Sequence, residues 1–136
     1  MSAQARQDVA LVTGAARGLG AAIARTLHEA GMRVIVGDVA VEGAWDVARS
    51  LDAEGATAIA MALDVREKQA FQAALDLAAD WGGIDVLVNN AAVSFIRPAM
   101  EITAEEFDHV LAVNLRGPFF ASQVIGAHLK ARKSIV

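Results

Sequence analysis

The sequence predicts an α/β domain built on a doubly wound parallel sheet, and three observations support this fold class. Short apolar segments alternate with helical patterns along the chain of 136 residues. The hydrophobic content is 55% although aromatic residues supply only 5%, which is typical of a parallel sheet covered by alanine-rich helices. A glycine-rich turn follows the first apolar segment directly, and a helical pattern starts within it (Thr13-Gly14-Ala15-Ala16-Arg17-Gly18-Leu19-Gly20).

The expected elements follow from the hydrophobic period and from the residues that end each segment. Short apolar runs predict strands at 8–13, 33–38, 57–63 and 84–89. Apolar residues at intervals of three and four predict helices at 19–30, 41–53 and 67–81. A last helix begins at the capping box Thr103–Glu106 and runs to about residue 133, where Lys130, Arg132 and Lys133 favour a helix C-terminus. Gly117-Pro118 is a candidate kink within it.

This alternation fixes the expected topology. Right-handed crossovers between parallel strands, with the glycine turn after the first strand, give a Rossmann-like sheet of order 3-2-1-4. Its ligand is expected at the carboxyl ends of the strands. Ser134-Ile135-Val136 reads as the opening of a fifth strand. We therefore expect a single dinucleotide-binding domain over residues 1–136, truncated at the start of that strand and incomplete at its C-terminus.

Charge and composition exclude several function classes. The net charge of −4 offers no basic field for nucleic acid or for an anionic membrane. The absence of cysteine excludes disulfides, thiolate catalysis and cysteine-based zinc sites. The three histidines have no metal-ligand spacing, so no metal site is expected. A polar N-terminus, without an apolar run long enough to cross a bilayer, favours a cytoplasmic protein.

The glycine turn predicts a site for phosphate. Glycines let the backbone turn tightly and approach a ligand, while the free N–H groups of the helix N-terminus face the anion. The spacing is G-x-x-x-G-x-G, which does not match the P-loop of nucleoside triphosphatases. Glycines also close turns for structural reasons alone, and the position between a strand and a helix favours nucleotide binding.

Asp38 ends the second predicted strand, 18 residues after Gly20. An acidic residue at this distance meets the adenosine ribose hydroxyls in dinucleotide-binding folds, and it would repel a 2′-phosphate. The carboxylate therefore favours NAD over NADP as the cofactor. Arg17 indicates the opposite preference, since a cation in the glycine turn could accept that phosphate. The alternative for Asp38 is a solvated acid at a strand end.

Five motifs together resemble the N-terminal half of a short-chain dehydrogenase/reductase, from Val9 to Val136. They are Thr13–Gly20, Asp38, Asp64-Val65, Asn89-Asn90-Ala91-Ala92 and Asn114. Ala92 stands where the family usually has glycine.

The resemblance implies roles for these residues. Gly14, Gly18 and Gly20 would bind pyrophosphate, Asp38 the ribose, and Asp64 with Val65 the adenine. Asn90 would support the cofactor and the central strand, and Asn114 would hold a water in the catalytic proton relay. The implied cofactor-binding set is Gly14, Arg17, Gly18, Leu19, Gly20, Asp38, Asp64, Val65, Asn90 and Ala91. The alternative for the asparagines is a purely structural one, in which their side-chain amides only make hydrogen bonds that connect loops.

The resemblance also implies a reaction, the transfer of hydride between NAD and a secondary alcohol or ketone. The family's catalytic serine, and its tyrosine and lysine, would lie beyond Val136, and the chain contains no tyrosine at all. Residues 1–136 alone are therefore expected to be inactive. The alternatives are a non-catalytic NAD-binding module, a module completed by another polypeptide, and a methyltransferase, which Asn89-Asn90 and Asn114 disfavour.

The expected partners are a small-molecule substrate and further protein chains. An unpaired outer edge on the fourth strand, at Val86-Leu87-Val88, would be a template for another chain. The apolar residues of the last helix would add exposed surface. We therefore expect a homo-oligomer, or a chain completed by a missing C-terminal segment.

Overall fold

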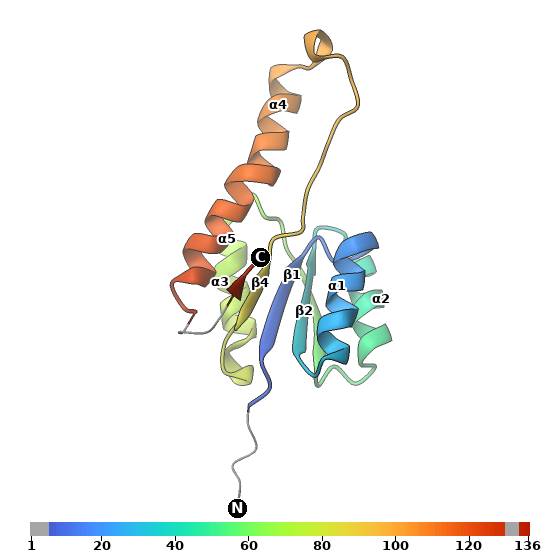
Figure 1. Ribbon diagram of the computed structural model, residues 1–136, viewed down its shortest axis with the longest axis vertical. Coiled ribbons are helices and arrows are strands. Elements are labelled where there is room, and N and C mark those ends of the chain that lie inside the picture. Colours follow the sequence, from blue (N-terminus) through green and yellow to red (C-terminus); the bar gives the residue numbers. More distant parts are fainter. Residues whose placement is uncertain (1–5, 130–133) are drawn as a thin grey trace, which may run out of the picture.

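The computed structural model describes residues 6–129 and 134–136, and these form a parallel sheet between two layers of helices (Figure 1). The strands are β1 (Val9–Thr13), β2 (Arg33–Asp38), β3 (Ala58–Ala62), β4 (Val86–Val88) and β5 (Ser134–Ile135). Their order is β3-β2-β1-β4-β5, and every neighbouring pair is parallel. The predicted Rossmann-like order 3-2-1-4 is confirmed, with β5 added beside β4.

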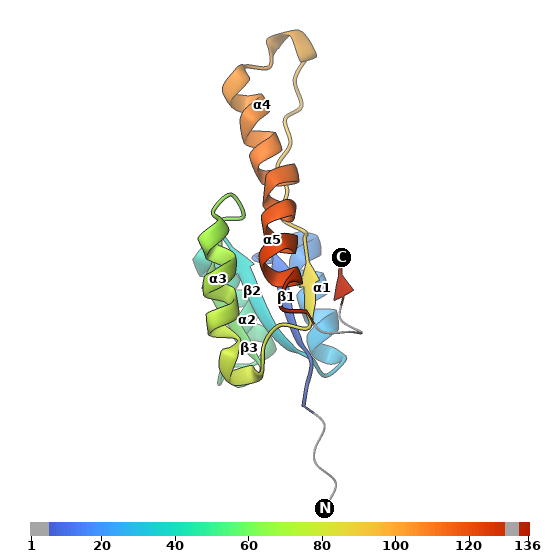
Figure 2. The same cartoon turned by 90° about the vertical axis from the view of Figure 1, so that its left-hand side faces the viewer.

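The helices divide between the two faces of the sheet (Figures 1 and 2). One face is covered by α1 (Gly18–Glu29) and α2 (Val41–Leu51). The other carries α3 (Lys68–Leu77) with the short 3₁₀ turn η1 (Ala79–Trp81), and α5 (Gly117–Gly126). Three further elements lie between β4 and α5: the 3₁₀ turn η2 (Ala99–Glu101), α4 (Ala104–Leu111) and the π-helical turn η3 (Ala112–Arg116).

The core lies in two clusters, one on each face of the sheet. Residues of a strand alternate between faces, so Leu11 packs toward α3 and α5 while Val12 packs toward α1 and α2. All five residues of β1 are buried, as expected for a central parallel strand. Phe71 on α3 is fully buried in the first cluster, and small alanines, such as Ala24 and Ala44, bring α1 and α2 close to the sheet.

The last helical segment, called the helical rod below, consists of α4, the π-helical turn η3 and α5, and it differs from the predicted helix. It starts at the expected capping box, where Thr103 accepts from the Glu106 N–H and Glu106 accepts from the Thr103 N–H. A π-helical turn, η3 (Ala112–Arg116), then joins α4 to α5 directly before Pro118. Because proline has no N–H, the backbone pairing must change near this point, and a wider turn accommodates it.

The rod ends at Gly126, so the prediction of a helix to about residue 133 is wrong. The N–H of Leu129 instead bonds to the Gly126 carbonyl in a turn that closes the helix. Lys130, Arg132 and Lys133 lie outside the described residues.

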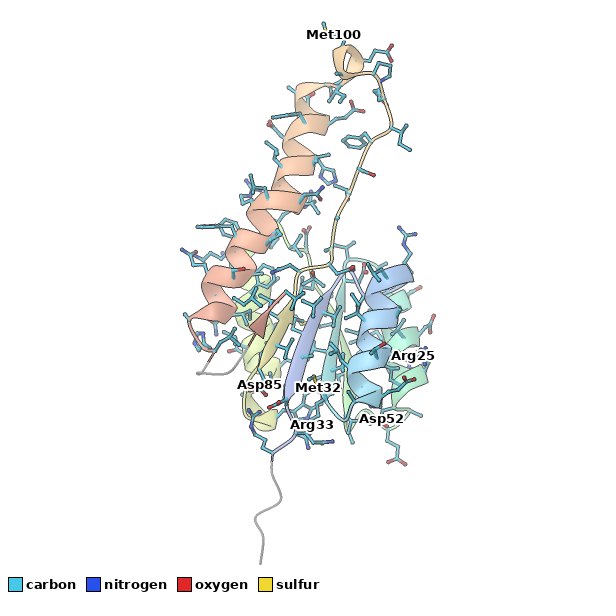
Figure 3. The ribbon with its side chains drawn as sticks, in the orientation of Figure 1. Arg25, Met32, Arg33, Asp52, Asp85 and Met100 are labelled. Carbon is cyan, nitrogen blue, oxygen red and sulfur yellow. The ribbon has the colours of Figure 1, made fainter. Side chains whose placement is uncertain are left out.

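The rod and the connection after β4 project beyond the carboxyl ends of the strands (Figure 1). Figure 3 shows Met100 at the tip of this projection, where Met100 and Ile96 are almost fully exposed. The expectation of an unpaired β4 edge is wrong, because Ser134 and Ile135 pair with Val86 and Leu87. Within the described part of the chain, no helix is long and apolar enough to cross a membrane.

Candidate functional site

A cavity of about 670 Å³ opens at the carboxyl ends of the strands. Each of the ten residues predicted to bind the cofactor lines it. They come from the glycine turn, the end of β2, the segment after β3 and the segment after β4. The parallel topology brings these four segments together, because the carboxyl ends of all strands meet at one edge of the sheet.

The glycine turn is shaped by two residues with positive φ and by close packing at two of its glycines. Gly14 has φ of +65° and Gly18 has φ of +56°, a region that favours glycine. A Cβ on Gly14 would lie 2.7 Å from the Cα of Ala91. At Gly20 a Cβ would collide with the Gly14 carbonyl and lie 2.5 Å from Nδ2 of Asn90. Backbone conformation or packing therefore favours glycine at all three positions. Of the three, only Gly18 has open space where a Cβ would lie.

The N-terminus of α1 faces the cavity with its backbone. Arg17 is the N-cap and is extended, and among the described residues no side chain caps this end of the helix. The first turn, Gly18 to Gly20, carries no acidic side chain and lines the cavity. Its N–H groups have no partner within the helix, so they are donors for an anion at the positive end of the helix dipole.

Asp38 joins two parts of the cavity wall. Its Oδ2 accepts from the Ala16 N–H at 2.9 Å, and its Oδ1 accepts from the Ala40 N–H at 2.9 Å. The carboxylate therefore holds the glycine turn against the start of α2. Each oxygen of a carboxylate has about two acceptor positions, so one remains on each oxygen of Asp38 for a ligand.

Asn90 and Thr13 connect β4 to the glycine turn. The Asn90 amide donates to the carbonyl oxygens of Thr13 and Gly14, both at 3.0 Å. The buried Thr13 hydroxyl accepts from the N–H groups of Asn90 and Ala91, each at 3.1 Å, and donates to the Val88 carbonyl at 3.3 Å. Sequence reasoning identified Asn90 and missed Thr13, whose partners lie more than seventy residues away.

Asp64 lines the cavity and has a partner that sequence reasoning missed. Arg66 donates from Nη2 to Oδ2 of Asp64 at 2.6 Å, and both residues line the cavity. The Arg66 side chain holds the pKa of the Asp64 carboxyl below its ordinary value, against a smaller opposing effect of burial. An Asp-x-Arg pair after a strand is the signal that could have indicated this contact.

Asn114 does not line the cavity, but it contacts a residue that does. Its side-chain Oδ1 accepts from the Val93 N–H at 2.9 Å, and its Nδ2 donates to the Val93 carbonyl at 2.8 Å. The role in a proton relay that the family resemblance implies stays a prediction. His109 lines the cavity and faces the ring of Phe95 at 6.4 Å, although the sequence analysis assigned no function to it.

Metal binding is not indicated by the described residues, where no group of three or more His, Cys, Asp or Glu side chains could hold an ion. Glu106 has structural partners, since it caps α4 and also pairs with Arg97 at 3.0 Å. The cavity is thus lined by backbone donors, by the carboxylates of Asp38 and Asp64, and by the amide side chain of Asn90.

A family model described as "short chain dehydrogenase" matches residues 8–135. The chain belongs to the short-chain dehydrogenase family. Among its relatives, D-threitol dehydrogenase of Mycolicibacterium smegmatis is 42% identical over 122 residues, which are 89% of this chain and 47% of that protein. L-xylulose reductase of Bos taurus is 40% identical over 126 residues, covering 90% of this chain and 48% of that protein.

Solved structures of short-chain dehydrogenases share the fold. A dehydrogenase/reductase from Sinorhizobium meliloti 1021 has a TM-score of 0.87 at 38% identity, over 94% of this chain and 52% of that one. A short-chain dehydrogenase from Burkholderia cenocepacia J2315, in complex with NADP, has a TM-score of 0.87 at 36% identity, over 97% of this chain and 55% of that one. The chain thus spans about half the length of the curated relatives it matches.

Proposed function

We propose that residues 1–136 form the cofactor-binding half of a short-chain dehydrogenase that uses NAD. The observation that carries this proposal is the single cavity wall shared by the glycine turn, Asp38, Asp64 and Asn90. The site also fits the chemistry of a dinucleotide: the uncapped α1 N-terminus offers donors for a pyrophosphate, and Asp38 has acceptor positions for the hydroxyls of a ribose.

The preference for NAD rather than NADP rests on the charge of Asp38. A carboxylate beside the ribose repels a 2′-phosphate. Arg17 lines the same cavity and is the candidate for the opposite preference, and one related structure is a complex with NADP. In our proposal Asp38 dominates, because two backbone N–H groups fix its carboxylate in the cavity wall.

The proposed reaction is hydride transfer between NAD and a secondary alcohol or ketone. When bound, the cofactor supplies the hydride acceptor. Residues of this chain bind and orient it, and Asn114 holds the segment around Val93 that forms part of the wall. The related threitol, sorbitol and galactitol dehydrogenases support a polyol as the substrate. We also propose a homo-oligomer, supported by the exposed apolar residues Phe107, Leu111, Leu115 and Phe119 along the last helical rod.

A second function is favoured by one observation, the absence of tyrosine from the 136 residues. The family's general acid/base is thus not among them, so these residues alone would bind NAD without turnover, or act when completed by further sequence. Intact mass of the purified protein and NAD-dependent oxidation of polyols distinguish these cases. Turnover by a protein of 14.2 kDa would contradict the proposal that the catalytic residues lie elsewhere.

Cofactor choice is tested by titration of NADH and NADPH, followed by nicotinamide fluorescence. We expect tighter binding of NADH, and reversal of the preference in Asp38→Arg. Asp46→Arg is the matched control, because it makes the same charge change on α2 at a side chain that is 81% exposed and outside the cavity lining. Equal binding of both nucleotides by the unsubstituted protein and by Asp38→Arg would contradict the assignment of Asp38.

A further inference from the structure

The guanidinium of Arg66 forms a side-on, hydrogen-bonded ion pair with the carboxylate of Asp64. Nη2 lies 2.6 Å from Oδ2, and Nε lies 3.0 Å from Oδ1 and 3.1 Å from Oδ2. The backbone N–H of Arg66 also donates to Oδ1 at 3.0 Å. A two-point contact of this kind fixes the plane of the carboxylate as well as its position.

The distribution of these donors leaves Asp64 with a defined acceptor. An ionised carboxylate has about four acceptor positions, two on each oxygen. Within the part of the chain that the structure describes, the backbone N–H of Arg66 donates to Oδ1, Nη2 donates to Oδ2, and the single Nε proton is shared between the two oxygens. Three donated protons thus meet about four acceptor positions, and the position that remains is assigned to Oδ2, the oxygen without a backbone donor.

The location of the pair matches a ligand contact. Asp64 and Arg66 both line the cavity, and their side chains are 27% and 43% exposed. The pKa of the Asp64 carboxyl is held below its ordinary value by Arg66 first and, more weakly, by the charge of His109. The carboxylate is thus ionised at neutral pH, and so it accepts hydrogen bonds and donates none.

We propose that Arg66 is a positioning residue that leaves Asp64 one acceptor for the exocyclic amino group of a bound adenine dinucleotide. This inference rests on the proposed function, in which Asp64 and Val65 contact the adenine. A hypoxanthine ring carries a carbonyl where adenine carries the amino group, and its oxygen would face the carboxylate without a proton between them. The Arg66–Asp64 pair therefore sets a preference for adenine over hypoxanthine.

The experiment compares NADH with reduced nicotinamide hypoxanthine dinucleotide, using nicotinamide fluorescence to measure both dissociation constants. We expect the unsubstituted protein to prefer NADH about tenfold, the size of one hydrogen bond to a charged group. Arg66→Gln is expected to reduce the preference to about twofold or less, because the carboxylate is no longer held. Arg66→Lys keeps the charge but not the two-point contact, so its preference is expected to fall between the two.

The control is Arg49→Gln, which removes an arginine from a solvent-exposed pair with Asp46 at 3.8 Å, outside the cavity lining. Its preference for NADH should equal that of the unsubstituted protein. The positioning role would be overturned if Arg66→Gln kept the preference of the unsubstituted protein for NADH. This includes the case in which the variant binds both nucleotides more weakly by the same factor. Equal binding of the two nucleotides by the unsubstituted protein would also overturn it. Failure to bind either nucleotide contradicts the proposed function instead.

Discussion

Asn114 satisfies both polar backbone groups of Val93, accepting from its N–H at 2.9 Å and donating to its carbonyl at 2.8 Å. Val93 lies in the connection after β4, which has no regular structure before η2. One amide thus makes the two bonds that a neighbouring strand would make to this residue. Because Asn114 lies in the π-helical turn η3, it couples the helical rod to the cavity wall.

Asn114→Ala should loosen the segment around Val93. Loss of both bonds is expected to lower the free energy of unfolding by about 1–2 kcal/mol. Hydrogen exchange of the Val93 amide should accelerate, since its acceptor is gone. Asn114→Asp keeps the acceptor and removes the donor, so the Val93 amide should stay protected in it. Gln72→Ala, which removes an exposed contact with Asp76, should change neither quantity. Unchanged exchange at Val93 in Asn114→Ala would contradict the coupling.

Thr13→Val tests the buried hydroxyl that joins β1 to the segment after β4. Valine has nearly the same shape, but it leaves the N–H groups of Asn90 and Ala91 without their acceptor. We expect a loss of about 1–3 kcal/mol in the free energy of unfolding, measured by urea denaturation. Thr13→Ser retains the hydroxyl and should lose less. An unchanged free energy of unfolding in Thr13→Val would show that the hydroxyl does not stabilise this contact.

The sheet could be predicted because its signal is local. Each strand is a short apolar run between turn residues, so order and direction followed from the alternation with helices. Strand ends were less accurate: the fourth strand was expected at 84–89 and is found at Val86–Val88. Ile84 is buried without extended pairing, so burial alone does not define a strand. The π-helical turn before Pro118 also has no simple periodic signal.

The cavity wall was predictable where backbone conformation decides the residue type. Gly14 and Gly18 require positive φ, and Asp38 ends a strand at the site. Thr13 and Arg66 were missed for different reasons. The bonds of Thr13 depend on tertiary contact across the sheet. Arg66 lies only two residues from Asp64, so the spacing allows the contact, but it does not fix the side-chain conformation that makes it.

Gly20→Ala should disrupt the glycine turn even though its helical backbone tolerates alanine. The added Cβ would collide with the Gly14 carbonyl and approach Nδ2 of Asn90 to 2.5 Å, so one of them must move. We expect lower stability, because overpacking typically costs about 1–3 kcal/mol, and weaker NADH binding. Gly126→Ala, also helical, meets only the flexible end of Ile135 at 3.4 Å and should be nearly neutral. Similar thermal midpoints for both variants would contradict the packing role of Gly20.

The loss of stability as the pH falls below about 4 should depend on Asp52, which lies at the end of the molecule opposite to Met100 (Figure 3). Its Oδ2 accepts from the Thr57 hydroxyl at 2.8 Å and from the Thr57 N–H at 2.7 Å, while Oδ1 accepts from the Glu54 N–H at 3.0 Å. These bonds, the Thr57 hydroxyl first, lower the pKa of the Asp52 carboxyl to about 2. The Thr57 hydroxyl oxygen also bonds to Nε2 of His28, and this bond connects the Asp52–Thr57 contact to α1.

The sign follows from the difference between the folded and unfolded states. An unfolded aspartate has a pKa near 3.9, so a folded value of about 2 stabilises the protein above pH 4. This contribution is lost as the pH falls from about 4 toward 2, where the folded carboxylate becomes protonated. Asp52→Asn should therefore be less stable than the unsubstituted protein at pH 6, and the difference should shrink toward pH 2. Urea denaturation across this range measures it, with Asp46→Asn as a solvent-exposed control on α2. A difference that stays constant from pH 6 to pH 2 would show that the Asp52 carboxylate does not carry this pH dependence.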